Sequence, residues 1–199
     1  MLEEAGYDFT VLPPAEDVEC GVCSESGPAG LVAELAYRKA AAVAKQLAAK
    51  PQAASGNSSS SVIVAADTVA ECDGFILGKP RDEADARAML MKLSGREHRV
   101  LTGICLWPLR LGLPSPEGRE RESFPRIEVA VTKLRMDDLT PAQLKEYIVS
   151  SQWEGKAGAF GYQDRLGWVH VVEGSESNVV GLPLELLAEM LGDIQAPTA

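Results

Sequence analysis

The chain has 199 residues, of which 46% are hydrophobic and 24% are charged, and its formal net charge is −10. This length is enough for one sizeable core or two small lobes. The negative charge argues against a nucleic-acid-coating surface, and no apolar stretch is long enough to cross a membrane. The acidic start, MLEEAGYDF, lacks the features of a secretory signal, so we expect a cytoplasmic protein without nucleic-acid or membrane partners.

The first quarter of the chain predicts a helix end, a strand, a loop and a long helix. Residues 1–6 have the pattern of a last helical turn that stops at Gly6. YDFTVLPP, residues 7–14, alternates like a strand that runs into a loop. Residues 15–28 are acidic and contain Gly and Ser, which is typical of a surface loop. Residues 29–50 are Ala-rich with apolar residues at helical spacing, and therefore predict a strong helix.

The four cysteines do not form a recognisable metal or disulfide pattern. Cys20 and Cys23 make a C-x-x-C pair, but Cys72 and Cys105 do not make a second one, as a structural zinc site would need. No strand-then-helix pattern surrounds CGVC, which argues against a thioredoxin-like redox motif. We therefore expect reduced thiols and no disulfide framework.

SVIVAADTVAECDGFILGKP, residues 61–80, is the most informative segment of the chain. Its first apolar, β-branched run predicts a buried strand that ends at Asp67. The Asp-Gly turn signal and a second apolar run then predict a hairpin that returns Lys79 to the same region. A carboxylate beside a cation is what metal-assisted phosphate chemistry requires. The alternative is a structural hairpin with a capping aspartate and a solvated lysine.

The rest of the chain alternates helices and further strands. DEADARAMLMKLSG, residues 82–95, predicts a helix with Asp82 as N-cap and Gly95 as its stop. Further elements are expected as strands at 96–108, 126–136 and 166–174 and as helices at 139–151 and 183–193. Residues 51–61 and 108–125 are low-complexity or proline-rich and have the composition of loop insertions. Because several strands follow one another directly, we expect an α/β fold with a mixed sheet.

Four more segments contain residues that carry chemistry, and each also has a structural interpretation. Lys39 in the long helix is alternatively a solvated cation, and His98 in KLSGREHRVLTG is alternatively a structural histidine, which we favour. KAGAFGYQ, residues 156–163, has two glycines whose N–H groups could approach a phosphate or a base. In SNVVGLP, Asn178 is expected to hold a turn before the last helix.

Taken in order, PP…E, KA, ADT, DGFILGKP, LSGREHRVLTG, KAGAFGYQ and SNVVGLP resemble the Maf family of nucleoside triphosphate pyrophosphatases, also called septum-formation inhibitor proteins. The resemblance covers nearly the whole chain, so we expect a single Maf-like domain over residues 1–199. It implies the Maf/ITPase-like fold, an elongated mixed β-sheet flanked by helices in two lobes with a central cleft, often as a homodimer. It also implies hydrolysis of a nucleoside triphosphate to the monophosphate and pyrophosphate, with Mg²⁺ or Mn²⁺ required, to remove non-canonical or excess nucleotides.

The resemblance assigns catalytic roles to residues of this chain. Asp67 falls on the family's catalytic acidic position and, alone or with Glu19 of the acidic loop, would hold the cation and orient or deprotonate a water. Lys39 and Lys79 would neutralise charge on the triphosphate and on the leaving pyrophosphate.

The remaining assigned residues concern the substrate. Gln163, also a catalytic position by the resemblance, would read the base edge together with the backbone around Gly158 and Gly161. Thr68 and Lys156 complete the expected substrate-binding set. The G-x-Q pattern and SNVVGLP look like the branch that acts on dTTP and UTP.

The chain departs from the family pattern in two places. It begins just after the first strand and the S-x-S-P-R-R-like phosphate loop, which we therefore expect it to lack. Glu34 also stands where the family commonly has an arginine. Two alternatives follow: a pyrophosphatase for another modified nucleotide, or a non-catalytic nucleotide-binding or cell-division regulatory protein. A nucleotide panel distinguishes a dTTP/UTP pyrophosphatase from a pyrophosphatase for another nucleotide. An assay of pyrophosphate release distinguishes both enzymes from the non-catalytic protein.

Overall fold

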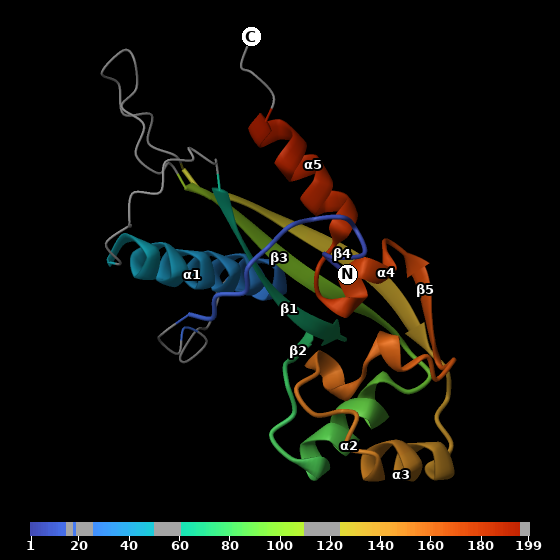
Figure 1. The fold of residues 1–199 in the computed structure, drawn as a ribbon. Helices are drawn as coiled ribbons and strands as arrows, with labels where there is room; N and C mark the ends of the chain where they lie inside the picture. The colour runs from blue at the N-terminus through green and yellow to red at the C-terminus, as the bar shows by residue number, and fades with distance from the viewer. Residues whose placement is uncertain (15–17, 19–25, 50–60, 110–123, 196–199) are drawn as a thin grey trace, which may run out of the picture.

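The computed structural model describes residues 1–14, 18, 26–49, 61–109 and 124–195, and shows an elongated sheet with helices on both faces (Figure 1). The strands are β1 (Ser61–Cys72), β2 (Phe75–Leu77), β3 (Glu97–Leu109), β4 (Arg126–Met136) and β5 (Val169–Glu173). The helices are α1 (Gly27–Ala49), α2 (Glu83–Leu93), α3 (Pro141–Val149), α4 (Glu176–Val180) and α5 (Leu184–Gln195), with 3₁₀ turns η1 (Ala157–Ala159) and η2 (Tyr162–Asp164). An α/β fold with a helix-flanked sheet is thereby confirmed.

The five strands form one sheet in the order β2-β1-β3-β4-β5. Every pairing among these described strands is antiparallel, whereas the sequence predicted a mixed sheet. The difference arises because β1 and β2 form a tight hairpin, and the helix α2 that follows delivers β3 antiparallel to β1.

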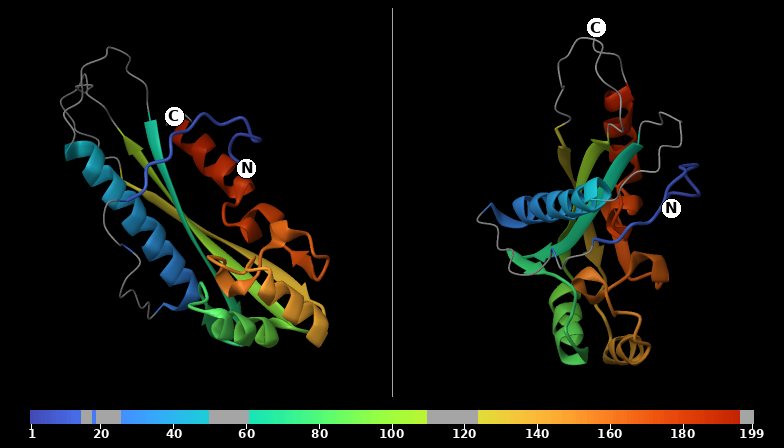
Figure 2. Two further views of the ribbon diagram at one scale, coloured as in Figure 1. Left: turned by 60° about the horizontal axis from the view of Figure 1, so that its bottom comes forward. Right: turned by 60° about the vertical axis from the view of Figure 1, so that its left-hand side comes forward.

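Alternate residues of the long strands face different helices, as the two-residue period of a strand requires. On one face, Ile63 of β1 and Cys105 of β3 pack against Ala36 and Ala40 of α1. On the other face, the side chains that pack against α5 come mainly from β3, namely Ile104 and Leu106. The two views of Figure 2 show α1 on one side of the sheet and α5 on the other.

A third group of helices closes one end of the sheet, where α2, α3 and the 3₁₀ turns gather (Figure 1). The largest buried cluster lies there and combines Leu90 and Leu93 of α2 with Leu134 and Met136 of β4. The Trp153 indole N–H, also buried in this cluster, donates to the Ile148 carbonyl at 3.0 Å, so a large ring is buried without losing its hydrogen bond.

Local sequence signals place the helix ends correctly. The Asp82 side chain accepts from the Asp85 N–H at 2.8 Å and caps α2, while Gly95 just beyond that helix has φ +70°. Thr140 and Gln143 form a reciprocal capping box at the start of α3. The predicted helix at 29–50 is α1, and the predicted strand at 126–136 is β4 with those bounds.

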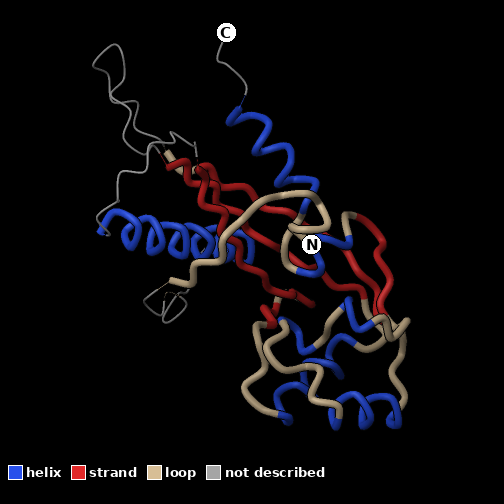
Figure 3. Tube along the Cα trace, viewed as in Figure 1, coloured by secondary structure: helices blue, strands red, loops and turns tan. Residues whose placement is uncertain are grey.

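Two local predictions are wrong. Residues 7–14 form no strand and appear as a tan loop in Figure 3; Phe9 and Val11 are 46% and 78% exposed, and the two prolines that follow lack the N–H groups a ladder needs. The strand that was expected to end at Asp67 continues to Cys72, because antiparallel pairing with β3 extends to Glu71 and β2 pairs with the last three residues.

Several predictions fall on residues that the structure does not describe. These include most of the two proposed insertions, since 50–60 and 110–123 are outside the described ranges. Glu19, Cys20 and Cys23 also lie outside them. No helix among the described residues is long and apolar enough to cross a membrane.

Candidate functional site

The site is centred on Asp67, which lies in the middle of β1 and points to the α1 side of the sheet. The Lys39 ammonium of α1 is 2.5 Å from Asp67 Oδ1 and 3.4 Å from the Ala66 carbonyl oxygen. The two side chains are only 20% and 11% exposed. Lys39 is therefore not the solvated helix cation of the alternative interpretation: it forms a largely buried ion pair with the carboxylate.

A glycine on the neighbouring strand lets α1 approach closely enough for this pair. Gly103 is the cross-strand partner of Asp67, and a Cβ built at Gly103 would lie 2.4 Å from the Val32 carbonyl oxygen of α1. Lys39 follows Val32 by seven residues, or about two helical turns, and so lies on the same side of the helix. The close approach of α1 at Gly103 therefore brings Lys39 within hydrogen-bonding distance of Asp67.

Thr68, next to Asp67, points to the opposite face and joins a buried polar network. Its hydroxyl lies 2.9 Å from that of Thr102, which donates to the Asn178 carbonyl oxygen at 3.3 Å. The Asn178 amide donates to Thr132 Oγ1 at 2.9 Å and to the Val100 carbonyl at 3.2 Å. Asn178 is 1% exposed, so its predicted structural role is confirmed and extended: it fastens α4 to the sheet.

Lys79 lies at the end of the β1–β2 hairpin and is exposed. Leu77, which pairs with Ala70, is the last residue of β2, and the chain then leads through Lys79 to α2. The Gly158 N–H donates to the Gly78 carbonyl at 3.0 Å, which fixes the Gly-rich segment beside GKP. The structure thus brings together two segments that are about 80 residues apart in the sequence.

The two glycines of KAGAFGYQ have structural uses. Gly158 has φ +70°, and a Cβ there would lie 3.0 Å from Ala70 Cβ, so only glycine fits without strain. The Gly161 N–H contacts the Tyr147 hydroxyl oxygen at 3.2 Å. The N–H groups of Gly158 and Gly161 both donate within the protein, and contact of this backbone with a phosphate or a base stays a prediction.

Lys156 was expected to contact substrate, but its ammonium is engaged within the protein. It lies 2.6 Å from both carboxylate oxygens of Asp164, and the two side chains are 21% and 11% exposed. Tyr147 donates to the same carboxylate at 2.8 Å. Asp164 and Tyr147 were not predicted from the sequence, since no spacing rule links a residue of α3 to one 17 positions later.

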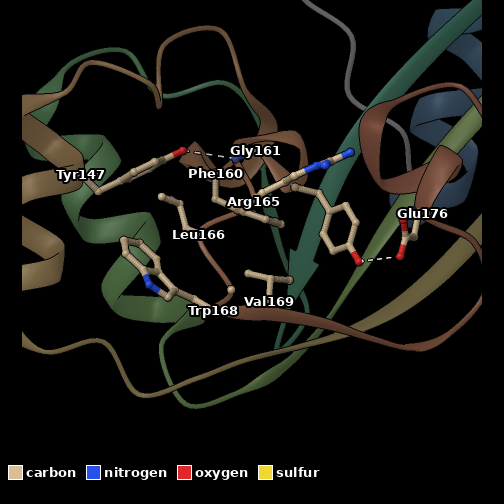
Figure 4. A pocket seen from close by; sticks show the side chains of 10 residues that line it. Tyr147, Phe160, Gly161, Arg165, Leu166, Trp168, Val169 and Glu176 are labelled. Carbon is tan, nitrogen blue, oxygen red and sulfur yellow. Dashed lines mark hydrogen bonds between the residues drawn. The ribbon is translucent and has the colours of Figure 1, made fainter. Parts of the chain in front are cut away.

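Gln163 lies in η2 between two anchored neighbours and is itself exposed. Within the described ranges, no hydrogen bond joins Gln163 to Asp67 or Lys39, and its assigned role stays a prediction. A pocket of about 330 Å³ lies beside η2, and Tyr147, Trp168, Arg165 and Glu176 help to line it (Figure 4). Aromatic and charged groups thus meet at one pocket, which the neighbouring Tyr162 lines and Gln163 does not.

His98 has a structural position, as expected. It is 3% exposed, and its ring meets the edge of Phe160 with 6.1 Å between centroids. Burial lowers the pKa of His98, which favours the neutral imidazole. Cys72 and Cys105 are free, buried thiols, and burial raises the pKa of Cys105 to about 11. Neither cysteine has the depressed pKa of a reactive thiolate.

Among the described residues, Asp67 is the carboxylate that this site offers to a cation. They contain no group of three or more His, Cys, Asp or Glu side chains arranged to hold a metal. This donor set still fits Mg²⁺, which is usually bound through one or two carboxylates together with substrate phosphates and water. Asp67 would be the protein ligand, and Glu19 lies in a part of the chain that the structure does not describe.

Comparison with known proteins gives the family of the chain. A family model described as "Maf-like protein" matches residues 1–194. A dTTP/UTP pyrophosphatase of Rhodopirellula baltica is 46% identical over 196 residues, which covers 98% of this chain and 77% of that protein. A dTTP/UTP pyrophosphatase of Carboxydothermus hydrogenoformans is 41% identical over 188 residues, which covers 94% of this chain and 88% of that protein. The chain therefore belongs to the Maf-like protein family.

Proposed function

We propose that this protein is a nucleoside triphosphate pyrophosphatase that converts dTTP and UTP to the monophosphate and pyrophosphate. The observation that carries the proposal is the ion pair between Lys39 and Asp67, which puts a cation and a carboxylate side by side in a largely buried position. Relatives that bear the name dTTP/UTP pyrophosphatase support the choice of substrates.

The roles of the charged groups follow from their chemistry. Asp67 orients or deprotonates the attacking water, and its ion pair with Lys39 holds the carboxylate in one position before substrate binds. Lys39 then contacts oxygens of the bound triphosphate. Lys79, exposed at the end of the hairpin, neutralises charge on the leaving pyrophosphate.

We also propose that a divalent cation takes part, with Asp67 as its protein ligand among the described residues. When bound, Mg²⁺ or Mn²⁺ would neutralise triphosphate charge and polarise a phosphoryl oxygen. The resemblance to the family supports this proposal, as does the fit of one carboxylate plus substrate oxygens to Mg²⁺.

Two further properties are proposed on family and chemical grounds. We place the protein in the cytoplasm, which agrees with the free thiols of Cys72 and Cys105. We also propose a homodimer, as is frequent in the family, and a mass measurement in solution by light scattering tests it.

A nucleotide panel tests the proposed function. The protein is incubated with dTTP, UTP, CTP, GTP and methylated GTP, each with Mg²⁺, with Mn²⁺ or with EDTA, and the products are separated by ion-exchange chromatography. We expect monophosphate and pyrophosphate from dTTP and UTP, and no turnover in EDTA. Orthophosphate with a diphosphate product would contradict cleavage between the α and β phosphates. Binding without any turnover would favour the non-catalytic alternative.

A further inference from the structure

A buried hydrogen-bonded network lies directly beside Gln163. Its hub is Asp164, whose carboxylate receives hydrogen bonds from the Lys156 ammonium at 2.6 Å and from the Tyr147 hydroxyl at 2.8 Å. The Tyr147 oxygen in turn accepts the Gly161 N–H at 3.2 Å. One carboxylate therefore connects α3, the start of the Gly-rich segment and η2.

Gly161 leaves room for this network because it has no side chain. A Cβ at Gly161 would lie 2.5 Å from the Lys156 ammonium and 2.7 Å from Asp164 Oδ2. The ion pair thus lies directly against the backbone of Gly161. The second glycine of KAGAFGYQ is explained by this contact, because any side chain there would separate the charges or displace the turn.

The environment of the network is largely buried and partly aromatic. Tyr147 is 3% exposed, and its ring meets Trp168 edge-to-face with 5.6 Å between centroids. Burial and the hydrogen bond to Asp164 raise the pKa of the Tyr147 hydroxyl, so it remains a donor at neutral pH. Removing one partner of a charged pair with this little exposure strongly destabilises the folded protein, since the other charge stays buried without compensation.

The residue on the other side of Gln163 is anchored as well. The Tyr162 hydroxyl donates to Glu176 of α4 at 2.8 Å, and Figure 4 shows this bond at the right of the pocket. After η2 the chain turns through Arg165, whose φ is +52° and whose N–H donates to the Tyr162 carbonyl at 3.2 Å. Gln163 is thus the exposed central residue of a short turn whose two neighbours are held by different helices.

We propose that Asp164 is a positioning residue for Gln163, acting through its contacts with Tyr147 and Lys156. The inference rests on the proposed function, in which Gln163 contacts the nucleobase. Asp164, Tyr147 and Lys156 do not touch the substrate; they fix the turn that presents Gln163. Lys156 accordingly belongs to this network and not to the substrate-binding set.

A double-mutant cycle tests the inference in the full chain with Mg²⁺ and dTTP. Asp164→Asn keeps the shape of the side chain and removes its charge, and we expect kcat/KM to fall about 10- to 100-fold, as misplacement of a contact by about 1 Å produces. In a Gln163→Ala background the same change should alter kcat/KM by less than about twofold, because two residues that act through one contact are not additive. Equal effects in both backgrounds would overturn the inference.

A second variant and a matched control separate positioning from general damage. Tyr147→Phe removes only the hydroxyl, so it should give the same non-additive pattern even if Asp164→Asn folds poorly. Glu173→Gln breaks an exposed ion pair with Lys133 on the sheet, and it should leave kcat/KM unchanged.

Amide hydrogen exchange supplies a readout that does not need turnover. Exchange across residues 157–165 should become faster in Asp164→Asn and Tyr147→Phe and stay unchanged in Glu173→Gln, since the network holds the Gly161 N–H. Unchanged exchange in both network variants would overturn the inference. A wild-type protein with no turnover of dTTP or UTP would instead refute the proposed function, while the exchange result still decides whether the network holds the turn.

Discussion

Gly103→Ala is the most direct test of how the site is built. The added Cβ would lie 2.4 Å from the Val32 carbonyl oxygen, 2.5 Å from its carbon and 2.8 Å from the Ala33 nitrogen. All three atoms belong to the backbone of α1, so no side-chain rotation can relieve the clash. An ordinary contact begins at 3.4 Å, which means that α1 must move by about 1 Å.

The size of the effect follows from this displacement. Overpacking of a close contact costs about 1–3 kcal/mol of stability. For a chain of this size each kcal/mol shifts Tm by about 2–4 °C, so we expect Tm to fall by about 2–12 °C. Because α1 carries Lys39, the same movement misplaces the cation at Asp67 and should lower kcat/KM about 100-fold.

Gly192→Ala is the matched control for this substitution. A Cβ at Gly192, which lies on α5, meets nothing within 4 Å. Alanine is the better helix former there, so Tm should stay the same or rise slightly and dTTP turnover should not change. Thermal melts followed by circular dichroism and pyrophosphate release compare the two variants. Wild-type stability and turnover in Gly103→Ala would refute the argument that this glycine sets the position of α1.

Three other predictions follow from single residues. Asp67→Asn should keep the fold with a lower Tm, because Lys39 loses its largely buried ion pair with Asp67, and it should lower kcat at least about 100-fold; near wild-type pyrophosphate release would contradict the role of Asp67. Asn178→Leu should lose about 2–4 kcal/mol in urea unfolding, because the buried Thr132 hydroxyl and a backbone carbonyl lose their donor; a loss below about 0.5 kcal/mol would be inconsistent with the network. Burial depresses the pKa of His98 below 6.5, so stability is fully present above about pH 6.5 and falls as the unfolded chain takes up the proton at lower pH. A His98→Gln variant with the same pH slope would disprove that contribution.

Local signals in the sequence were enough to place most elements of the fold. Capping residues such as Asp82 and Thr140 act within one helical turn, so their effect does not depend on distant contacts. The Asp-Gly turn between β1 and β2 is of the same kind. The strand predicted at 7–14 failed because alternation of side chains does not by itself supply a partner strand, and the ladder of a strand is a long-range property.

The internal contacts of the site could not be predicted from local signals. Lys39 and Asp67 are separated by 28 residues, and their pairing depends on how closely α1 lies over Gly103. A family pattern can mark both residues as important, but it does not show that they contact each other. The ion pair of Lys156 with Asp164 could not be predicted for a related reason: an exposed cation and a largely buried, paired one look alike in a sequence, and only packing distinguishes them.

The pairing of β1 with β3 accounts for the Asp-Thr and Thr-Gly dipeptides together. Asp67 is paired with Gly103, and Thr68 is paired with Thr102. On the α1 face, the carboxylate needs a lysine from a close helix, and the glycine opposite permits that approach. On the α4 face, the two threonine hydroxyls meet at 2.9 Å and connect to the Asn178 carbonyl. Consecutive strand residues face opposite sides of the sheet. The Asp67-Thr68 and Thr102-Gly103 dipeptides therefore contact α1 on one face and α4 on the other at the same point of the sheet. A shift of either helix therefore acts on the Asp67 position through the backbone of β1.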